Sequence, residues 1–528
     1  MVLRNEYPRP NYVRENWKTL NGEWNFVFDD QNRGIIEGWP ESGLPHPRKI
    51  VVPFAYQSPL SGVNVQTEHP IVWYHREFEV PTDWDQQRVL INFGAVDYTC
   101  TVWVNGALVG QNRGGYTSFT LDITEQIADG NNSIVVRVED HPLTTQPRGK
   151  QRARKENFAC WYTPVTGIWQ SVWLEAVGAN YLERVKLIPD IDQNTLLVEY
   201  WLNAYSPDLR LECTLSLEGR EISTTTIPIP EQMTFFSDIV ARRDGTFMVN
   251  IPNPQLWSPE SPTLYDLTFR LYAGDDLLDE VNTYAGMRKV HTENGKIYLN
   301  NKPYYLRMIL DQGFWPEGIY TPKSIEEIRY DVEMTKQFGF NGARKHQKFE
   351  DPYYYYYCDH LGLLTWCEMA APYIYDEDVS ESITYEWQRL VIRHYNYPSV
   401  MAWVPVNESW GVDQLTQGSK DPRLVHHLMT MYHLTKSIDP TRIVVGNDGW
   451  HQAATDLIAI HDYTQDAADL QAKYRKFKED RHTKTFTHGH QILLPGYAYQ
   501  GQPIMITEFG GVKVEEQGAE GWGYGDAA

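Results

Sequence analysis

The C-terminal part of the chain, from about residue 290 onward, alternates between short apolar segments and amphipathic helical segments. Strict alternation of strand and helix requires parallel strands joined by right-handed crossovers. This pattern predicts a (β/α)8 TIM barrel, with a doubly wound sheet as the alternative. The seven strand-like segments are residues 304–310, 340–344, 363–368, 400–406, 443–446, 457–460 and 504–507.

Helix start and stop signals lie between these segments. Ser324 with Glu327 forms a capping box, and Asp351 with Pro352 pairs an N-cap with proline at the first helical position. A later helical pattern stops before Pro398. The signals predict helices after the first, second and third strands of the barrel.

The predicted barrel has only seven of its eight strands. After the seventh segment about 20 residues remain, too few for a helix, an eighth strand and a final helix. An open barrel would expose two parallel strand edges. We therefore expect a chain that is truncated before the last strand of its barrel.

The region before the barrel shows strand periodicity instead. Residues 98–104 alternate in polarity, Asn105-Gly106 supplies a type I′ hairpin turn, and residues 134–139 alternate again. Residues 1–180 therefore predict an antiparallel sandwich, and the short strands of residues 181–288 predict a small immunoglobulin-like β-sandwich. The barrel would then occupy residues 289–528.

The charge balance, the cysteines and the apolar runs of the chain limit its binding partners and its location. Asp and Glu outnumber Lys and Arg by 69 to 47, which argues against nucleic acid or an anionic membrane surface. Five scattered cysteines without C-x-x-C spacing predict neither a disulfide framework nor a structural zinc site. The start of the chain lacks the apolar core of a signal peptide, and no apolar run approaches membrane-spanning length, so we expect a cytoplasmic protein.

Barrel enzymes place their chemistry at the carboxyl ends of the strands. Glu408 and Glu508 directly follow apolar strands there, and we expect both to face one cavity. A pair of carboxyl groups suits glycosidic bonds, because one protonates the leaving oxygen while the other stabilises or captures the anomeric carbon. The side chains at all the predicted strand ends are Asp311, Arg344 with His346, Glu368, Asn407 with Glu408, Asp448, His461 with Tyr463, and Glu508.

At these residues the chain resembles glycoside hydrolase family 2, the group of β-galactosidases, β-glucuronidases and β-mannosidases. Residues 399–409 (SVMAWVPVNES) are similar to the family's acid/base segment, and residues 503–510 (PIMITEFG) to its nucleophile segment. The resemblance implies that Glu408 is the acid/base and that Glu508 is the nucleophile. We expect no cofactor and no metal ligand among the site residues.

The same resemblance implies roles for neighbouring residues. Asn407 would bind the sugar 2-hydroxyl, Arg344 would order the nucleophile, Tyr463 would hydrogen-bond it, and His461 would contact substrate. The family often shows Arg-x-x-His after its second strand, with the histidine as a sugar contact. His346 lies only two positions after Arg344 and so departs from this spacing. Three residues keep two alternatives, substrate contact or a supporting or packing role: Asp311, Glu368 and Trp410.

The upstream domains resemble the same family. Residues 20–24, 52–54, 73–76 and 167–173 look like its N-terminal sugar-binding jelly roll, and residues 256–265 like the end of its immunoglobulin-like domain. The resemblance implies a retaining exo-glycosidase acting on an oligosaccharide or glycoside, most similar to a β-galactosidase, and by analogy a homo-oligomer. The alternatives are β-glucuronidase or β-mannosidase activity, a non-catalytic carbohydrate-binding protein, and metal-dependent hydrolysis, which the Glu-rich strand ends disfavour.

Overall fold

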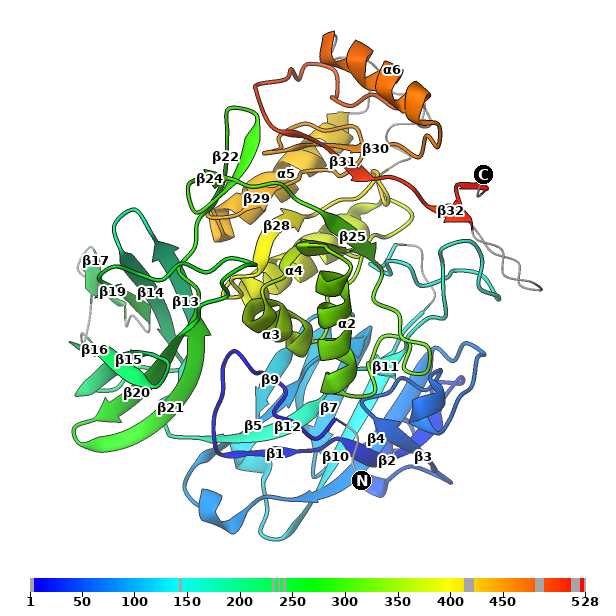
Figure 1. The fold of residues 1–528 in the computed structure, drawn as a ribbon. Helices are drawn as coiled ribbons and strands as arrows, with labels where there is room; N and C mark the ends of the chain where they lie inside the picture. Colours follow the sequence, from blue (N-terminus) through cyan, green and yellow to red (C-terminus); the bar gives the residue numbers. More distant parts are fainter. Residues whose placement is uncertain are drawn as a thin grey trace.

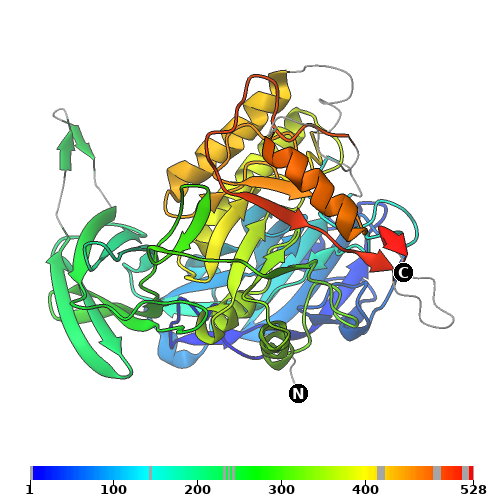
Figure 2. The same ribbon diagram turned by 45° about the horizontal axis from the view of Figure 1, so that its top comes forward.

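The computed structural model describes residues 4–141, 145–229, 233–235, 238–240, 244–412, 422–479, 489–513 and 523–526. Three domains follow one another along the chain, and Figure 1 shows the N-terminal domain in blue and cyan, the second in green, and the barrel from green to red. In the turned view of Figure 2, as in Figure 1, the C-terminal segment lies on the side away from the second domain.

The N-terminal domain is a sandwich of two antiparallel sheets that share one apolar core. The predicted hairpin is confirmed, since Asn105 and Gly106 have φ of 50° and 79° and connect two paired strands. One sheet has the order β1 (Trp17–Thr19), β12 (Val172–Val177), β5 (Arg88–Phe93), β9 (Phe119–Asp122). The other has the order β3 (Arg48–Val52), β2 (Gly22–Phe28), β4 (Ile71–Glu79), β10 (Asn131–Glu139), β7 (Thr99–Val104), β8 (Ala107–Arg113). The smaller elements are β6 (Val96–Asp97) paired with β11 (Gly167–Ile168), α1 (Trp39–Ser42), and the 3-10 turns Pro59–Ser61, Thr82–Trp84 and Thr124–Gln126.

The second domain is a smaller sandwich with its own core. Its alternating strands bury every second side chain, as the sequence pattern predicts. The sheets are β13 (Leu182–Asp190), β14 (Thr195–Leu202), β19 (Asp244–Asn250), and β16 (Arg220–Pro228), β15 (Leu209–Leu217), β20 (Tyr265–Ala273), β21 (Asp276–Ala285), with a hairpin of β17 (Met233–Phe235) and β18 (Asp238–Val240).

The third domain contains seven described parallel barrel strands with helices outside them. The two predicted helix starts are confirmed by their caps: Ser324 accepts a hydrogen bond from the amide of Glu327, and Asp351 from that of Tyr353. The strands are β25 (Met308–Asp311), β26 (Gly342–Lys345), β27 (Leu364–Glu368), β28 (Val400–Val404), β29 (Ile443–Val444), β30 (Ile458–His461) and β31 (Ile504–Glu508). The helices are α2 (Ile325–Gln337), α3 (Pro352–Leu361), α4 (Glu377–His394), α5 (Pro422–Ile438) and α6 (Ala467–Glu479), and a short pair β32 (Val512–Lys513), β33 (Gly525–Asp526) follows.

The predicted first strand, residues 304–310, begins too early. The amide of Tyr304 donates to Ile297 O, so this part of the segment belongs to a hairpin that precedes the barrel. Val290 and Leu299 of that hairpin share a core with Leu364, the first residue of β27. The hairpin thus covers the amino ends of the strands and leaves their carboxyl ends for chemistry. Its strands are β22 (Val290–Glu293), β23 (Lys296–Leu299) and β24 (Lys302–Pro303).

Two hydrogen-bonded groups make up the barrel wall. Strands β25 to β29 form one parallel sheet, and β30 pairs in parallel with β31. The amide of Asp456 donates to Val444 O at 2.9 Å and links the two groups. None of the helices in the described ranges is long and apolar enough to cross a lipid bilayer.

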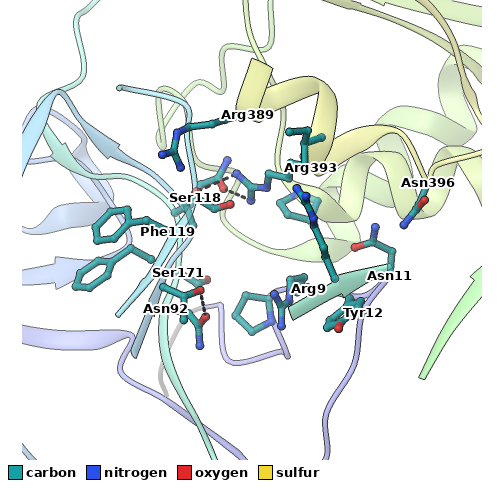
Figure 3. A pocket seen from close by; sticks show the side chains of 18 of the residues that line it. Arg9, Asn11, Tyr12, Asn92, Ser118, Phe119, Ser171, Arg389, Arg393 and Asn396 are labelled. Carbon is teal, nitrogen blue, oxygen red and sulfur yellow. Dashed lines mark hydrogen bonds between the residues drawn. The ribbon is translucent and has the colours of Figure 1, made fainter. Parts of the chain in front are cut away.

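The jelly roll packs against helix α4 of the barrel. Arg393 of this helix donates to Gly94 O at 2.9 Å and to Gln170 Oε1 at 3.0 Å, both in the N-terminal sandwich. A cavity of about 440 Å³ remains where all three domains meet, and Figure 3 shows Arg393, Asn92 and Arg9 around it. These contacts fix the jelly roll beside the barrel, which matters for the site below.

Candidate active site

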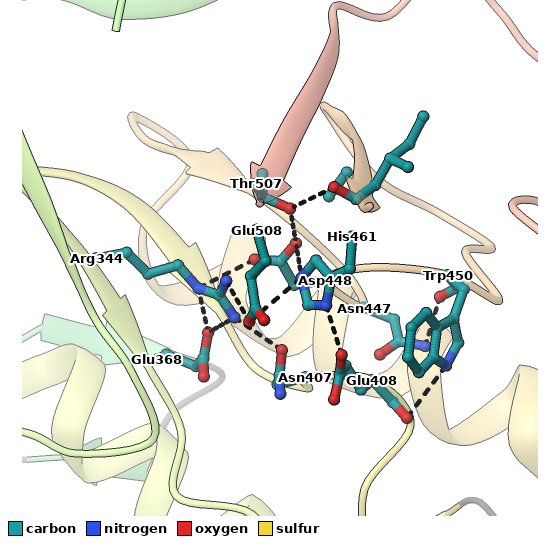
Figure 4. Close-up of polar contacts among 12 residues, drawn as sticks. Arg344, Glu368, Asn407, Glu408, Asn447, Asp448, Trp450, His461, Thr507 and Glu508 are labelled. Atoms are coloured by element: carbon teal, nitrogen blue, oxygen red, sulfur yellow. Dashed lines mark hydrogen bonds and ion pairs between the residues drawn. The ribbon is translucent and has the colours of Figure 1, made fainter. Parts of the chain in front are cut away.

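Six polar side chains converge at the carboxyl ends of six neighbouring barrel strands (Figure 4). Each lies near the carboxyl end of its strand or directly after it, so the fold itself delivers it to the mouth of the barrel. Five of the six are buried, and the sixth, Glu408, keeps 16% of its side chain exposed. The six are Arg344, Glu368, Glu408, Asp448, His461 and Glu508.

The carboxyl groups of Glu408 and Glu508 face the same imidazole. His461 Nδ1 lies 2.6 Å from Glu408 Oε1, and His461 Nε2 lies 3.4 Å from Glu508 Oε1. One ligand-type atom from each of the three residues lies within 4.8 Å of the others. A separation of about 5–5.5 Å between carboxyl groups is typical of glycosidases that retain configuration, because one group then reaches the anomeric carbon directly.

Positive charge surrounds Glu508. Arg344 Nη1 donates to Glu508 Oε1 at 2.8 Å, and the Tyr463 hydroxyl donates to the other carboxylate oxygen. Burial alone would raise the pKa of Glu508, but the charges of His461 and Arg344 outweigh it and hold this pKa well below its usual range. Glu508 is therefore an anion near neutral pH.

Arg344 is the centre of the polar cluster. Its guanidinium contacts Glu368 at 2.7 Å, Asp448 at 3.1 Å and Asn407 Oδ1 at 2.7 Å, besides Glu508. Burial disfavours its charge, yet the carboxylates of Asp448 and Glu368 raise the pKa of Arg344 above that of a free arginine. The side chain is thus a fixed cation that holds three carboxylates in one arrangement.

Glu408 has an unusual backbone. Its φ is 50° and that of Ser409 is 60°, both in the left-handed region that non-glycine residues rarely adopt. The amide of Glu408 donates to Asp448 O at 2.8 Å, and the indole N–H of Trp410 donates to the Glu408 carboxylate at 3.1 Å. The turn directs this carboxyl group into the mouth and holds it there, and such strained residues concentrate at functional sites.

The side-chain amide nitrogen of Asn407 is free to donate a hydrogen bond to a ligand. Its Oδ1 accepts from Arg344, while its buried Nδ2 has no hydrogen-bond partner among the residues that the structure describes. A buried amide without a partner is costly unless a ligand completes it. The amide is therefore placed to donate to a hydroxyl group of a bound molecule.

The domains and motifs identify the family. Three models of glycosyl hydrolases family 2 match the chain in order: the sugar binding domain over residues 17–175, the model described as glycosyl hydrolases family 2 over residues 180–288, and the TIM barrel domain over residues 290–520. The chain belongs to glycosyl hydrolase family 2.

Relatives of known name agree with this assignment. The family 2 chain is 27% identical to a β-galactosidase of Thermoanaerobacter pseudethanolicus over 405 residues, 74% of this chain and 50% of the relative. It is 27% identical to a β-galactosidase of Leuconostoc mesenteroides over 484 residues, 85% of this chain and 44% of the relative. The chain spans about half the length of the curated relatives it matches.

Solved structures share the fold. The crystal structure of Ruminococcus gnavus β-glucuronidase aligns with a TM-score of 0.76 at 19% identity, covering 98% of this chain and 88% of that one. A Bacteroides uniformis β-glucuronidase aligns with a TM-score of 0.74 at 20% identity, covering 94% of this chain and 59% of that one. The three-domain architecture expected from the sequence, with its TIM barrel, is thus confirmed.

The remaining predicted residues of this family 2 site are either enclosed beneath the mouth or partly exposed at it. Glu368 is enclosed and accepts from Arg344, from the amide of Gln347 and from His346 at 2.9 Å, which favours a supporting role for Glu368 and His346. Asp311 pairs with Lys345 at 2.6 Å and keeps 21% of its side chain exposed. Trp410 lies at the mouth beside Glu408.

The structure adds residues to the predicted site and gives a role to one predicted strand-end residue. Asp448, which the sequence placed among the strand ends without a role, is buried and contacts both His461 and Arg344. Cys160 and Trp161 come from the jelly roll, and the ring of Trp161 lies 5.9 Å from that of Trp410. Only a cluster of basic residues just before them in the sequence marks this segment as unusual.

Glu408, His461 and Glu508 also have the geometry of a three-ligand metal site. A metal needs a neutral imidazole as its ligand. Burial disfavours a charge on His461, but Glu508 together with hydrogen bonds to Asp448 and Glu408 raises the pKa of His461 to about 10. In its protonated form the imidazole donates hydrogen bonds to Glu408 and Asp448.

The charge on His461 predicts how stability depends on pH. An unfolded histidine has a pKa of about 6.5, below the folded value of about 10. The charged imidazole therefore stabilises the fold fully below about pH 6.5, and this contribution, a few kcal/mol, is lost as the pH rises toward 10. We expect the thermal unfolding midpoint of His461→Gln to lie well below that of the wild type at pH 6 and to approach it by pH 10.

Replacing an exposed histidine of helix α5 gives the control, His433→Gln, which should change the unfolding midpoint little at any of these pH values. A deficit for His461→Gln that stays constant or widens between pH 6 and pH 10 would contradict a charged imidazole.

Proposed function

We propose that the chain carries the catalytic machinery of a retaining exo-acting β-glycosidase that removes a terminal sugar. The placement of Glu408 and Glu508 on either side of His461, with one oxygen of each carboxyl group within 4.8 Å, carries the proposal. The names of two curated relatives support β-galactosides as the first substrates to test, whereas the name of a third supports β-glucuronides. The structural neighbours named β-glucuronidases support β-glucuronides as the alternative, with β-mannosides third.

In the first step Glu508 attacks the anomeric carbon and forms a glycosyl–enzyme ester. Its strongly depressed pKa keeps it ionised for this attack. Glu408 gives its proton to the glycosidic oxygen as the bond from that oxygen to the sugar breaks, and the aglycone leaves as an alcohol. The free amide N–H of Asn407 donates to the sugar 2-hydroxyl, a contact that strengthens as positive charge develops on the ring.

In the second step Glu408, now a carboxylate, takes a proton from water. The water oxygen attacks the anomeric carbon from the face that the aglycone left, and the ester bond to Glu508 breaks. Two inversions at one carbon give net retention. Arg344 and Tyr463 hydrogen-bond to Glu508 and stabilise its negative charge when the carboxylate forms again.

A panel of 4-nitrophenyl β-glycosides tests the proposal on the full chain. We expect nitrophenol release from at least one of the galactoside, glucuronide and mannoside, with the β-anomer of the sugar as first product by NMR. Release of the α-anomer would contradict retention. Binding of sugars without release from any glycoside, unaffected by Glu508→Ala, would favour a carbohydrate-binding protein without activity.

A further inference from the structure

A basic loop of the jelly roll, residues 148–155, stands out in this acidic chain. Its sequence is RGKQRARK, five cations in eight residues without an acid, in a protein whose formal net charge is −22. A run of like charges is usually a solvated surface segment. Here Arg148, Lys150 and Arg152 are buried, while Arg154 and Lys155 are exposed, so the loop is not simply solvated.

The basic loop is fixed to the barrel mouth. The amide of Gly149 donates to Ala371 O at 3.0 Å, and the hydroxyl of Tyr373 donates to Gly149 O. Gly149 has φ of 59°, and a Cβ there would lie 2.3 Å from Gln347 O. Because Gln347 follows β26 while Ala371 and Tyr373 follow β27, the loop lies across the carboxyl ends of these strands.

The segment after the loop extends over the neighbouring strand ends. Tyr162 packs on Phe314, beyond β25, with ring centroids 4.7 Å apart. Trp161 lies edge-on to Trp410, beyond β28, at 5.9 Å, and Trp410 donates to the carboxylate of Glu408 at 3.1 Å. The jelly roll therefore forms a wall of the mouth next to Glu408.

Lys150 is the cation of the loop that lies closest to this wall. Its ammonium group lies 4.7 Å from the centre of the Trp161 ring and 3.5 Å from Cys160 Sγ. Trp161 in turn contacts Trp410, whose indole donates to the carboxylate of Glu408. The chain of contacts places Lys150 on the same side of the site as Glu408.

No described carboxylate pairs with Lys150. Within the described ranges its ammonium group contacts a thiol and an aromatic face, although only 6% of the residue is exposed. Arg152 donates to backbone carbonyl groups, and its buried Nε has no partner in the part of the chain that the structure describes. Buried cations are normally paired, so an anion from outside would complete this arrangement.

We propose that the basic loop binds a carboxylate or sulfate group of an acidic saccharide, on the leaving-group side of the scissile bond. The proposal rests on the proposed function, because Glu408 defines that side as the acid that protonates the departing oxygen. The net charge of the protein repels a polyanionic substrate over most of its surface, and the loop reverses the sign of the field where the aglycone enters. Lys150 supplies the buried contact, and Arg154 and Lys155 supply attraction from the rim.

Paired disaccharides test this preference. The glycone is the sugar identified by the nitrophenyl panel, and the reducing-end sugar is neutral, sulfated or a uronic acid. The quantity measured is the ratio of kcat/KM for each anionic disaccharide to that for the neutral one. We expect a ratio above about 10 for the wild type at low salt, and a several-fold lower ratio at about 0.5 M NaCl.

Variants connect the preference to the loop. Lys150→Gln should lower the ratio about tenfold, and the pair Arg154→Gln with Lys155→Gln should lower it several-fold. The matched control, Lys296→Gln with Lys302→Gln, removes two exposed cations from the hairpin that covers the opposite end of the barrel and should leave the ratio unchanged. A wild-type ratio near one, or a high ratio that survives the loop substitutions, would overturn the proposal.

Calorimetric binding of the sulfated and neutral disaccharides to the full chain separates this proposal from the proposed function. Tighter binding of the sulfated compound, lost in Lys150→Gln, supports the loop even if neither compound is hydrolysed, in which case the proposed function alone fails. Equal binding of both compounds, with hydrolysis of both, retains the proposed function and rejects the anionic site.

Discussion

Replacing Glu508 by alanine is expected to lower kcat on a 4-nitrophenyl β-glycoside by about 10⁴-fold or more, equivalent to about 5.5 kcal/mol of transition-state free energy. The variant lacks the atom that attacks the anomeric carbon, and no other described carboxylate contacts both Arg344 and Tyr463 as Glu508 does. The single-turnover rate of nitrophenol release measures the loss directly.

Sodium azide should restore part of this activity. The small anion fits the space of the missing carboxylate and attacks the anomeric carbon from the same face, so the product is the α-glycosyl azide. In Glu408→Ala the nucleophile is intact, and azide instead replaces water in the second step to give the β-glycosyl azide. Exposed Glu293→Ala, on the hairpin β22, is the control and should keep wild-type activity. A Glu508→Ala variant with more than a tenth of wild-type kcat, or a β-azide product from it, would refute the assigned role.

Replacing Arg344 by methionine is expected to lower kcat by about 10³-fold and to destabilise the fold by about 3–5 kcal/mol. The guanidinium is buried and contacts Glu368, Asp448 and Glu508, so its removal leaves three carboxylates without their shared cation. Methionine approximates the length of the arginine stem, which separates the loss of charge from the loss of volume.

The stability deficit of Arg344→Met should depend on pH in a defined direction. Arg344 lowers the folded-state pKa of Asp448 and of Glu508, so the stabilisation is present above their unfolded values of about 4 and is lost as the pH falls through the folded ones. The difference in thermal midpoint between wild type and variant is therefore largest at and above about pH 5 and shrinks as the pH falls below about 4. Arg329→Met, on the exposed face of α2, is the control and should cost less than about 0.5 kcal/mol. A wild-type kcat, or a deficit that grows in acid, would contradict a central role for Arg344.

Local sequence signals predicted much of the barrel because they act over a few residues. The cap at Ser324, the Asp351-Pro352 pair and the apolar run before Glu508 each determine an element without knowledge of the rest. The start of the first strand was wrong because Tyr304 looks like strand by composition, while its backbone pairs with the preceding hairpin. The pairing partner lies only seven residues upstream, and the turn Asn300-Asn301, with φ of 52° and 62°, was the local signal that the strand pattern overlooked.

The site was predictable to the same extent. Glu408 and Glu508 end strands of one barrel, and parallel topology brings such ends together. Lys150 and Trp161 lie in another domain, more than 200 residues before Glu408. No pattern in the sequence indicates that they lie at the mouth of the barrel. Their position depends on how the jelly roll packs against α4 and on a glycine contact at Gly149, which only the folded chain reveals.

The close approach of Gly149 to the barrel means that selectivity and chemistry reside on separate polypeptide modules. Mutation of Arg154 or Lys155 can retune which saccharides enter while the bond-breaking carboxylates stay untouched, because neither position is sterically confined. Gly149 itself has no such freedom, since any side chain would collide with Gln347 O and detach the loop. Excising the barrel for engineering would discard half of its own entrance, whereas libraries confined to the tip of residues 153–156 would vary substrate range on an intact catalyst.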